Sequence, residues 1–469
     1  MLYPLDILKL LVAKNYPTYI VGGFVRDYIL KKPTITTDVD IATRAKPDEI
    51  IEIVKENGAE KIDVVGKSFG VVIVDGTEVA TFRKDRYNGT GNANLTVEYA
   101  DTLMEDMQRR DLTINAIAIN EFEMIVDPLR YENDVKDRLI RFVGNADMRI
   151  REDPVRMIRA CRFLSYIDGY FDPESFKAIV RHKNLLDTVP KERIRLEVMK
   201  AISKTRKSSK FFVALYQARI LEKILPSLEK CAGINQNSFH SESVFTHNMF
   251  TGDEISCKTP LLKLTAYLHD IGKPSTKTTK TVNNVVIDYS FLKHEEVGAE
   301  LVRKDLEVLK FSNEEIDFVS NLIALHMRHI YGRKPLRKTL NALEEKGLKL
   351  QDLLRLRIAD GKGKRPINLM VMKDVRDVLS TYREIIKGNE ATTEKQLAVD
   401  GIDIMKILGI QPGKAVGLAK KLLLEMVLDE PKFNTFEACE TALLYWKEHG
   451  FPKEEAEVTV FQSEGEMGG

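Results

Sequence analysis

The chain has 469 residues, which is enough for several domains, and 43% of them are apolar, which is ample for folded cores. Its 71 Lys and Arg residues balance 70 Asp and Glu residues, so a net charge of +1 excludes a global basic field, and any nucleic-acid binding must use local patches. The four cysteines lack metal-site spacing and are typical of reduced thiols. We see no signal peptide and no membrane-spanning segment, so the sequence predicts a cytoplasmic protein.

The first predicted elements are a short buried strand at residues 19–21, a turn at Gly22 and Gly23, and a helix starting near residue 24. Asp38 and Asp40 follow, interleaved with apolar residues. In a strand, residues i and i+2 point to the same face, so these two carboxylates would converge. Carboxylates can hold magnesium, and a glycine turn at a helix end can hold phosphate. The combination points to nucleoside triphosphate chemistry, although a lone pair of this kind is more often two solvated loop acids.

Further strands are predicted at residues 71–74, 79–82 and 124–126, among helical patterns. Asp75-Gly76 between the first two is a hairpin signal. These elements predict a small α/β domain. From about residue 145 onward strand signals nearly vanish and helical periodicity dominates.

A basic segment at residues 109–116 follows an acidic helical turn. Arg110 could clamp a triphosphate, because its guanidinium offers a fixed fork of donors. Asp111 and Asn115 could position ribose or the backbone. Taken alone, an ordinary charged helix cap explains this segment better.

A helix predicted to begin at Pro154 carries Asp153 and Arg156 as i,i+3 neighbours, followed by Arg159 and Arg162. Cytosine and adenine both present an exocyclic amine beside a ring acceptor. A carboxylate next to a guanidinium complements that pattern, so Asp153 with Arg156 could accept CTP and ATP and reject UTP and GTP. A surface salt bridge on a basic helix is the plainer alternative.

Four segments in order, residues 21–27, 38–43, 109–116 and 152–156, resemble the motifs of class II tRNA nucleotidyltransferases. These are the bacterial-type CCA-adding enzymes, a family shared with bacterial poly(A) polymerases, and the resemblance runs over essentially the whole chain. This sequence departs from the next family motif at Arg130 and Tyr131, where that motif usually has glycines. Residues 66–72 are similar to CCA-adding enzymes rather than to poly(A) polymerases.

The resemblance implies two-metal nucleotidyl transfer with release of pyrophosphate. Its partners would be the 3′ acceptor end of tRNA and the substrates CTP and ATP, with no membrane and no DNA. A loop at residues 84–94 would help switch the pocket from C to A, although composition alone indicates a plain surface loop. The implied site residues are Asp38 and Asp40 for two Mg²⁺ ions, Gly23, Arg26 and Arg110 for the phosphates, and Asp153, Arg156, Arg159 and Arg162 for the nucleotide pocket.

A second signature surrounds His269-Asp270, which follows an apolar helical run. Histidine with carboxylate makes a transition-metal site, although any one histidine is more often structural. The pattern resembles an HD-superfamily phosphohydrolase domain. The resemblance implies a core set of His247, His269, Asp270 and Asp360, which His294 and His326 would complete as a dinuclear site.

The predicted fold is an α/β nucleotidyltransferase head followed by an all-α body, a multidomain mixed α+β chain. Residues 399–403 and 411–421 resemble the part of these enzymes that holds tRNA, although a helical domain with solvated lysines is nearly as good an interpretation. The expected domains are the head at 1–143, a nucleobase-binding helical neck at 144–230, an HD domain at 240–385, a tRNA-binding body at 394–460 and a disordered tail at 461–469.

The leading functional expectation is a CCA tRNA nucleotidyltransferase that adds or repairs the 3′-terminal CCA. A CC-adding enzyme, an A-adding enzyme and a poly(A) polymerase share every motif quoted. A metal-dependent HD phosphohydrolase is the alternative of a different class, and a non-catalytic RNA-binding protein is a third.

Overall fold

The computed structural model describes residues 1–32, 39–65, 70–87, 95–237, 241–282 and 285–452. The chain divides into two compact units. The first contains Met1–Ile234, Gly252–Leu264 and Lys304–Ser312, and the second contains Asn235–Thr251, Thr265–Arg303 and Asn313–Gly469. Asp38, residues 66–69, residues 88–94 of the predicted loop and the predicted tail lie outside the described residues.

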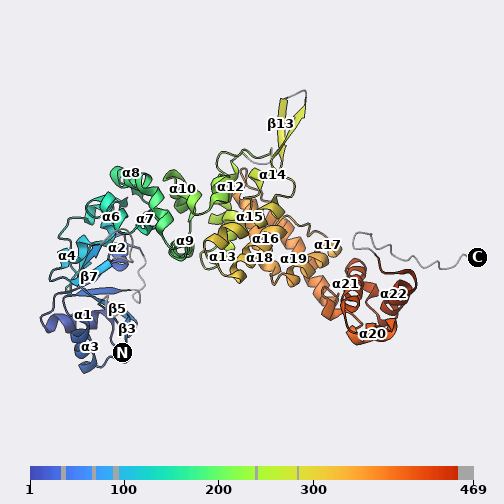
Figure 1. Cartoon of the computed structure of the whole chain (residues 1–469), viewed down its shortest axis with the longest axis horizontal. Coiled ribbons are helices and arrows are strands. Elements are labelled where there is room, and N and C mark those ends of the chain that lie inside the picture. The colour runs from blue at the N-terminus through green and yellow to red at the C-terminus, as the bar shows by residue number, and fades with distance from the viewer. Residues whose placement is uncertain (33–38, 66–69, 88–94, 238–240, 283–284, 453–469) are drawn as a thin grey trace, which may run out of the picture. The chain divides into compact units, whose positions relative to one another are not determined.

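The first unit begins with a mixed sheet, part of which is labelled in Figure 1. Its strands follow the order β3-β4-β5-β2-β1-β8-β9. The strands are β1 (Thr18–Val21), β2 (Asp40–Thr43), β3 (Ile62–Val65), β4 (Val71–Val74), β5 (Thr77–Thr81), β8 (Ala118–Ile119) and β9 (Ile125–Val126). The strands predicted around residues 19, 71, 79 and 124 are therefore confirmed. Helices α1 (Pro4–Ala13) and α3 (Pro47–Glu56) pack against β1, β2 and β4.

The predicted hairpin turn is present between β4 and β5, where Val74 pairs with Thr77. Asp75 and Gly76 have φ angles of 50° and 90°. Positive φ at both central residues is the conformation that two-residue hairpins require, and Asp-Gly adopts it at low cost.

Strand pairing sets the positions of the first site residues. β1 ends at Val21, opposite Asp40 in the antiparallel neighbour β2, and helix α2 (Gly23–Ile29) starts directly afterwards. β2 is parallel to β5, and Asp40 is in register with Glu78. The glycine turn and two carboxylates thus meet at one end of three central strands, β5, β2 and β1.

The remaining elements of the head lie between β5 and residue 143. They are β6 (Arg83–Tyr87), β7 (Leu95–Tyr99), α4 (Leu103–Gln108), the 3-10 turn η3 (Thr113–Asn115), α5 (Glu132–Lys136) and β10 (Leu139–Ile140). A cluster that includes Val21, Phe82, Met107 and Ala118 forms the core beneath them. This core fixes α4 and η3 against the strands that carry the carboxylates.

Helices follow the head in the first unit. They are α6 (Ala146–Glu152), α7 (Val155–Ile167), α8 (Pro173–His182), α9 (Lys191–Lys204), α10 (Ser209–Gln217) and α11 (Pro226–Glu229), with the short strand β11 (Tyr170–Phe171) pairing to β10. Helix α7 packs against both α9 and α10. It is largely buried because Met157, Ile158 and Cys161 lie on its inner face.

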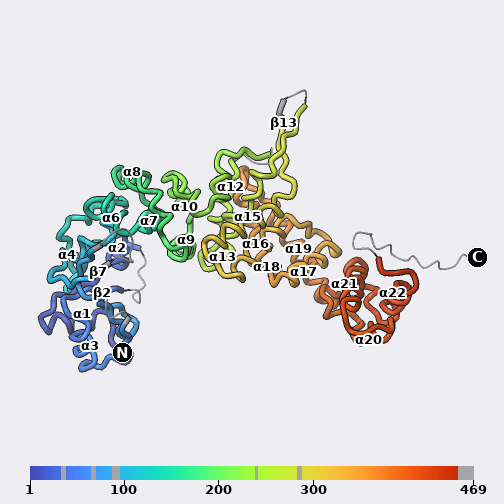
Figure 2. Tube along the Cα trace, viewed as in Figure 1, coloured from blue at the N-terminus to red at the C-terminus, as the bar shows by residue number. Residues whose placement is uncertain are grey.

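The second unit is mostly helical, and Figure 2 follows the chain through it. Its helices before residue 388 are α12 (Val244–Asp253), α13 (Pro260–Leu268, begun in the first unit), α14 (Lys273–Thr276), α15 (His294–Val308, completed in the first unit), α16 (Asn313–Leu325), α17 (Arg333–Glu345), α18 (Leu350–Gly363) and α19 (Val371–Lys387).

The body is helical, as predicted, and its described part also contains β11 and one hairpin. Strands β12 (Thr278–Val282) and β13 (Val285–Ser290) form this hairpin, which projects from the helices of the second unit (Figure 1). Every residue of β12 is exposed. A strand with no buried face lacks the apolar alternation by which strands are recognised, so the hairpin was not predicted.

After residue 388 the chain forms α20 (Gly401–Leu408), α21 (Lys414–Asp429) and α22 (Phe436–His449), around a core that includes Ile404, Leu423, Leu443 and Trp446. Helix α20 begins at Gly401, and Gly413 directly precedes α21. Among the described residues, no helix combines the length and apolar character needed to cross a membrane.

Candidate functional site

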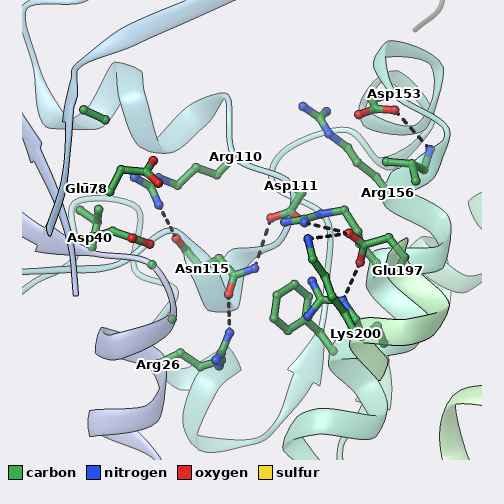
Figure 3. A pocket seen from close by; sticks show the side chains of 18 of the residues that line it. Arg26, Asp40, Glu78, Arg110, Asp111, Asn115, Asp153, Arg156, Glu197 and Lys200 are labelled. Carbon is green, nitrogen blue, oxygen red and sulfur yellow. Dashed lines mark hydrogen bonds and ion pairs between the residues drawn. The ribbon is translucent and has the colours of Figure 1, made fainter. Parts of the chain in front are cut away.

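A cavity of ≈ 940 Å³ in the first unit is lined by residues of the head strands, α2, α7 and α9. It contains all the predicted nucleotide-site residues that the structure describes (Figure 3). These are Gly23, Arg26, Asp40, Arg110, Asp153, Arg156, Arg159 and Arg162. Asp38 lies outside the described residues, so its convergence with Asp40 stays a prediction.

The carboxylate end of the cavity is formed by Asp40 and Glu78, which lie next to each other in Figure 3. A Cβ atom at Gly22 would lie 3.0 Å from Oδ2 of Asp40, so the turn must carry a glycine for the carboxylate to approach. Gly22 also has a φ of +77°, which disfavours other residues. Sequence reasoning missed Glu78, because its pairing with Asp40 depends on two strands 35 or more residues apart along the chain.

Arg110 borders this end and is held by Asp106. Its Nη2 and Nε donate to Oδ2 of Asp106 at 3.0 and 3.3 Å, and its Nη1 donates to the carbonyl of Asn115 at 3.2 Å. Arg109 binds the other oxygen of Asp106 at 2.7 Å. Burial alone would raise the pKa of Asp106, but Arg110 and Arg109 outweigh it and lower that pKa. The ionised Asp106, missed from the sequence, aligns both guanidinium groups.

Arg26 is more enclosed than a simple phosphate ligand. Its guanidinium donates to both carboxylate oxygens of Asp27 at 3.0 Å and to Oδ1 of Asn115 at 2.9 Å. It also lies over the rings of Phe163 and Tyr166, at 5.0 and 4.7 Å from their centroids. These contacts tie α2 to α7, so Arg26 fixes the base of the cavity as well as lining it.

The predicted base-reading pair takes separate partners. Asp153 accepts two hydrogen bonds from Arg193 of α9, at 3.1 and 2.7 Å, and Arg156 donates to Glu152 at 2.6 Å. Asp153 and Arg156 are both buried. Arg193 was missed because it lies 40 residues beyond Asp153.

Arg159 and Arg162 are held by two carboxylates. Arg159 binds Oδ2 of Asp111 at 2.6 Å, and Arg162 donates to Oε2 of Glu197 at 2.6 Å. Burial opposes ionisation of Asp111, but Arg159 and Arg156 outweigh it and hold its pKa well below the usual range. Glu197, which also lies 3.7 Å from Arg159, was missed. The cavity thus joins a carboxylate end suited to a divalent cation to an arginine-rich wall suited to phosphates.

The second unit holds a separate cluster of histidines and carboxylates. It consists of two groups that could each hold a metal ion: His247, His269 and Asp360, and Asp270, His294 and His326. All six residues were predicted from the sequence. Asp270 is grouped with His294 and His326, and it also lies beside His247 and His269, with which the expected core set placed it.

Asp270 faces both groups. Its Oδ2 lies 3.3 Å from Nε2 of His269 and 3.6 Å from Nε2 of His247, and its Oδ1 lies 3.3 Å from Nε2 of His294 and 3.7 Å from Nε2 of His326. A carboxylate with one oxygen toward each group can bridge two cations. Burial opposes ionisation of Asp270, but His269 and Lys273 outweigh it and hold its pKa well below the usual range.

The histidine rings are oriented for metal binding. Nδ1 of His269, His294 and His326 contacts the carbonyl oxygen three residues earlier, at 2.9, 2.8 and 2.6 Å. This arrangement places Nε2 toward the cluster. The Nε2 atoms of His294 and His326 are buried and form no hydrogen bond within the described part of the chain. The donor set therefore fits one or two transition-metal ions.

Comparisons with known proteins identify three domains. The family model "Poly A polymerase head domain" matches residues 18–141, "Probable RNA and SrmB- binding site of polymerase A" matches 170–231, and "HD domain" matches 238–360. The part that matches the head domain holds the carboxylate end of the cavity.

Among its relatives, the CCA-adding enzyme of Geobacillus thermodenitrificans is 41% identical over 202 residues, which are 42% of this chain and 48% of that protein. The A-adding tRNA nucleotidyltransferase of Deinococcus radiodurans is 28% identical over 343 residues, 69% of this chain and 75% of that protein. The chain spans about half the length of the first of these relatives.

The fold of this chain is similar to the crystal structure of the Bacillus stearothermophilus CCA-adding enzyme in complex with CTP. The TM-score is 0.68 and the identity 24%, over 95% of this chain and 97% of that one. The predicted head with a helical body is therefore confirmed as a fold.

Proposed function

We propose that this protein is a CCA tRNA nucleotidyltransferase, which adds or repairs the 3′-terminal CCA of tRNA from CTP and ATP. The observation that carries the proposal is the single cavity that joins Asp40 and Glu78 to Arg110 and to the Asp153 and Arg156 pair. The relatives named CCA-adding enzymes support it. No membrane or DNA partner is proposed, and the proposed location is the cytoplasm.

The proposed cofactor at the carboxylate end is Mg²⁺, held by Asp40 with Asp38, and with Glu78 as a further oxygen donor. When bound, the metal lowers the pKa of the RNA 3′-hydroxyl and stabilises charge on the α-phosphate as pyrophosphate leaves. The close approach of Asp40 to the Gly22 turn fits such a site, because a Cβ at Gly22 would lie 3.0 Å from the Asp40 carboxylate and crowd its donor atoms. Arg110, oriented by Asp106, would bind the triphosphate, with Gly23 and Arg26 beside it.

The base would be selected by protein side chains. The Asp153 carboxylate would accept the exocyclic amine of cytosine or adenine, and Arg156 would donate to the ring acceptor. Arg193 would hold the Asp153 carboxylate in plane through its two hydrogen bonds of 2.7 and 3.1 Å. Arg159 and Arg162, held by Asp111 and Glu197, would complete the pocket near the phosphates.

The segments that lead α20 and α21 are proposed to hold the tRNA. Gly413 precedes the Lys-led α21, which offers its first N–H groups, whereas those of α20 are already capped by the Asp400 carboxylate, so α21 is the stronger candidate. Helix starts and lysines suit contacts to the phosphate backbone. Binding of tRNA is then expected to weaken steeply with salt.

The test is label incorporation into three tRNA transcripts, ending before CCA, after C and after CC. CTP and ATP are supplied singly and together, with UTP and GTP as controls. Addition of two C and one A, then a stop, is the expected result. Only C or only A would mean a CC-adding or A-adding enzyme, long A tails on unrelated RNA would mean a poly(A) polymerase, and no incorporation would overturn the proposal.

A second candidate activity, metal-dependent phosphoester hydrolysis, is favoured by the cluster in the second unit. Asp270 would bridge two transition-metal ions, with His247, His269 and Asp360 on one side and His294 and His326 on the other. When bound, such ions supply an activated water nucleophile. Absence of bound metal together with no phosphatase activity under added nickel, cobalt or manganese would overturn this candidate.

A further inference from the structure

One histidine of the second-unit cluster is oriented differently from the other three. His269, His294 and His326 each place Nδ1 against a carbonyl oxygen three residues earlier. At His247 the same nitrogen lies 3.3 Å from Oε1 of Glu242, an ion-pair contact without hydrogen-bond geometry, while its Nε2 lies 3.0 Å from Oδ1 of Asp360. A carboxylate thus lies on the side of the ring opposite the cluster.

The Glu242 carboxylate is itself held in place. Its side chain is only 5% exposed, and its second oxygen, Oε2, accepts a hydrogen bond from the backbone N–H of Arg365 at 3.1 Å. Ser241, the residue before it, donates from both its backbone N–H and its hydroxyl to the carbonyl of Arg365 at 3.0 Å. These bonds fix the carboxylate between α18 and α12.

We propose that Glu242 is a positioning residue for the metal ligand His247, binding its Nδ1–H so that Nε2 is presented to a transition-metal ion beside His269 and Asp360. A carboxylate behind a ligating imidazole fixes the tautomer and makes the ligand more basic. The inference rests on the second candidate activity, metal-dependent hydrolysis. It adds that only one of the two metal positions, the one formed by His247, His269 and Asp360, depends on Glu242. The position formed by Asp270, His294 and His326 does not.

The test measures cobalt binding to the full chain, stripped of metal and titrated with Co²⁺, by calorimetry and visible absorption. The wild type is expected to bind two ions. Glu242→Leu is expected to weaken one of them by about 10–100-fold, the range for loss of such a partner, and to leave the other unchanged. Glu242→Gln keeps an acceptor oxygen without the charge, so it is expected to restore part of the lost affinity.

A matched control is Glu390→Gln. Glu390 is a glutamate of the same unit, with a side chain 10% exposed, whose carboxylate binds Arg337 at 2.6 Å and which does not belong to the cluster. It is expected to lower the unfolding temperature without changing cobalt binding. Equal loss of both ions in Glu242→Gln and Glu390→Gln would mean a structural role and overturn the inference.

The outcomes distinguish failure of the proposed role of Glu242 from failure of the proposed metal centre. Two unchanged cobalt sites in Glu242→Leu would overturn the role of Glu242 and leave the metal centre standing. Failure of the wild type to bind cobalt would overturn the metal centre, and Glu242 with it.

Discussion

The charged residues of the cavity are held in pairs, and this pairing determines what each can do. Asp106 aligns Arg109 and Arg110, Asp111 and Glu197 hold the arginines of α7, and Arg193 holds Asp153. Asp40 lines the carboxylate end beside Gly22. Loss of one of these paired residues is therefore expected to affect folding and ligand binding together, whereas loss of the Asp40 carboxylate is expected to affect mainly the chemistry.

Asp40→Asn is expected to reduce nucleotide incorporation by more than about 100-fold, because even the outer partners of metal ligands cost about 10–100-fold. The unfolding temperature should stay near that of the wild type. The measurement is single-turnover incorporation with a thermal melt. The control is Asp63→Asn on β3 of the same sheet, whose side chain is 51% exposed, and incorporation near wild type in Asp40→Asn would refute the assignment.

Arg193→Ala is expected to lower the free energy of unfolding by about 1–3 kcal/mol, because the Asp153 carboxylate would lose its partner while still buried. Arg193→Lys should recover part of this loss, since an ammonium group cannot reproduce the two-pronged contact. Both variants should raise KM for CTP and ATP more than they lower kcat. Urea unfolding and initial rates provide the measurements.

Arg181→Ala is the control for Arg193→Ala. Arg181 binds Asp147 at 2.6 Å, with side chains 52% and 34% exposed, and such surface pairs contribute only about 0–1 kcal/mol. Equal effects of the two substitutions would argue against a special role for Arg193.

At the scale of elements, the turn between β1 and α2 and the pairing of β2 with β5 build the carboxylate end. The turn supplies a helix start beside a strand, and the parallel register supplies Glu78. Helix α9 then supplies Arg193 and Glu197 from across the cavity. The site therefore depends on three separate elements converging, and a change of backbone at the turn should be as damaging as loss of a carboxylate.

Gly22→Ala tests whether the turn between β1 and α2 is needed for nucleotide incorporation, and Gly76→Ala is its control for backbone strain alone. Both glycines have positive φ, +77° and +90°, so both substitutions are expected to lower stability. The expected cost is about 1–2 kcal/mol for Gly76→Ala, and about 1–3 kcal/mol for Gly22→Ala, because the ψ of Gly22 is −136°, outside the left-handed helical region. A Cβ at Gly22 would meet Asp40 at 3.0 Å, whereas a Cβ at Gly76 meets nothing within 4 Å. Only Gly22→Ala should therefore lose incorporation, and equal activity of the two variants would show that the close approach is unimportant.

At the scale of the whole molecule, the two candidate sites lie in different compact units. The cavity is built only from residues of the first unit, and the histidine cluster only from residues of the second. No described residue takes part in both. The two activities are therefore expected to be separable by mutation.

His294→Gln is expected to remove one metal ion and any phosphatase activity, while CCA addition stays within about twofold of the wild type. Asp40→Asn should show the reverse pattern, because ΔΔG values of sites that share no partners are close to additive. Metal content, phosphatase rate and incorporation are measured on both variants and on the double variant. Loss of incorporation in His294→Gln would contradict the separation.

Local sequence was enough to predict those turns, strands and helix starts whose conformation depends on residues close together in the chain. The Asp75-Gly76 turn, the strand at residues 71–74 and the start of α2 follow from local backbone preferences and apolar patterns. The six cluster residues and the arginines of α7 were recognisable because their residue types and spacing carry the chemistry, and the resemblance to a known family placed them in order.

Which charged side chains lie in contact with one another depends on the packing of distant segments. Four residues that line the cavity or orient its arginines were not predicted. Three of them meet their partners through strand register or helix packing: Glu78, Arg193 and Glu197. Asp106 binds neighbouring arginines, whose place in the cavity depends on the packing of the head. The division of the cluster at Asp270 has the same origin, since its two oxygens face ligands on different helices. The β12–β13 hairpin also had no sequence signal, because its first strand buries none of its residues. Local sequence fixes local conformation, whereas partners distant along the chain are chosen by the packing that brings them together.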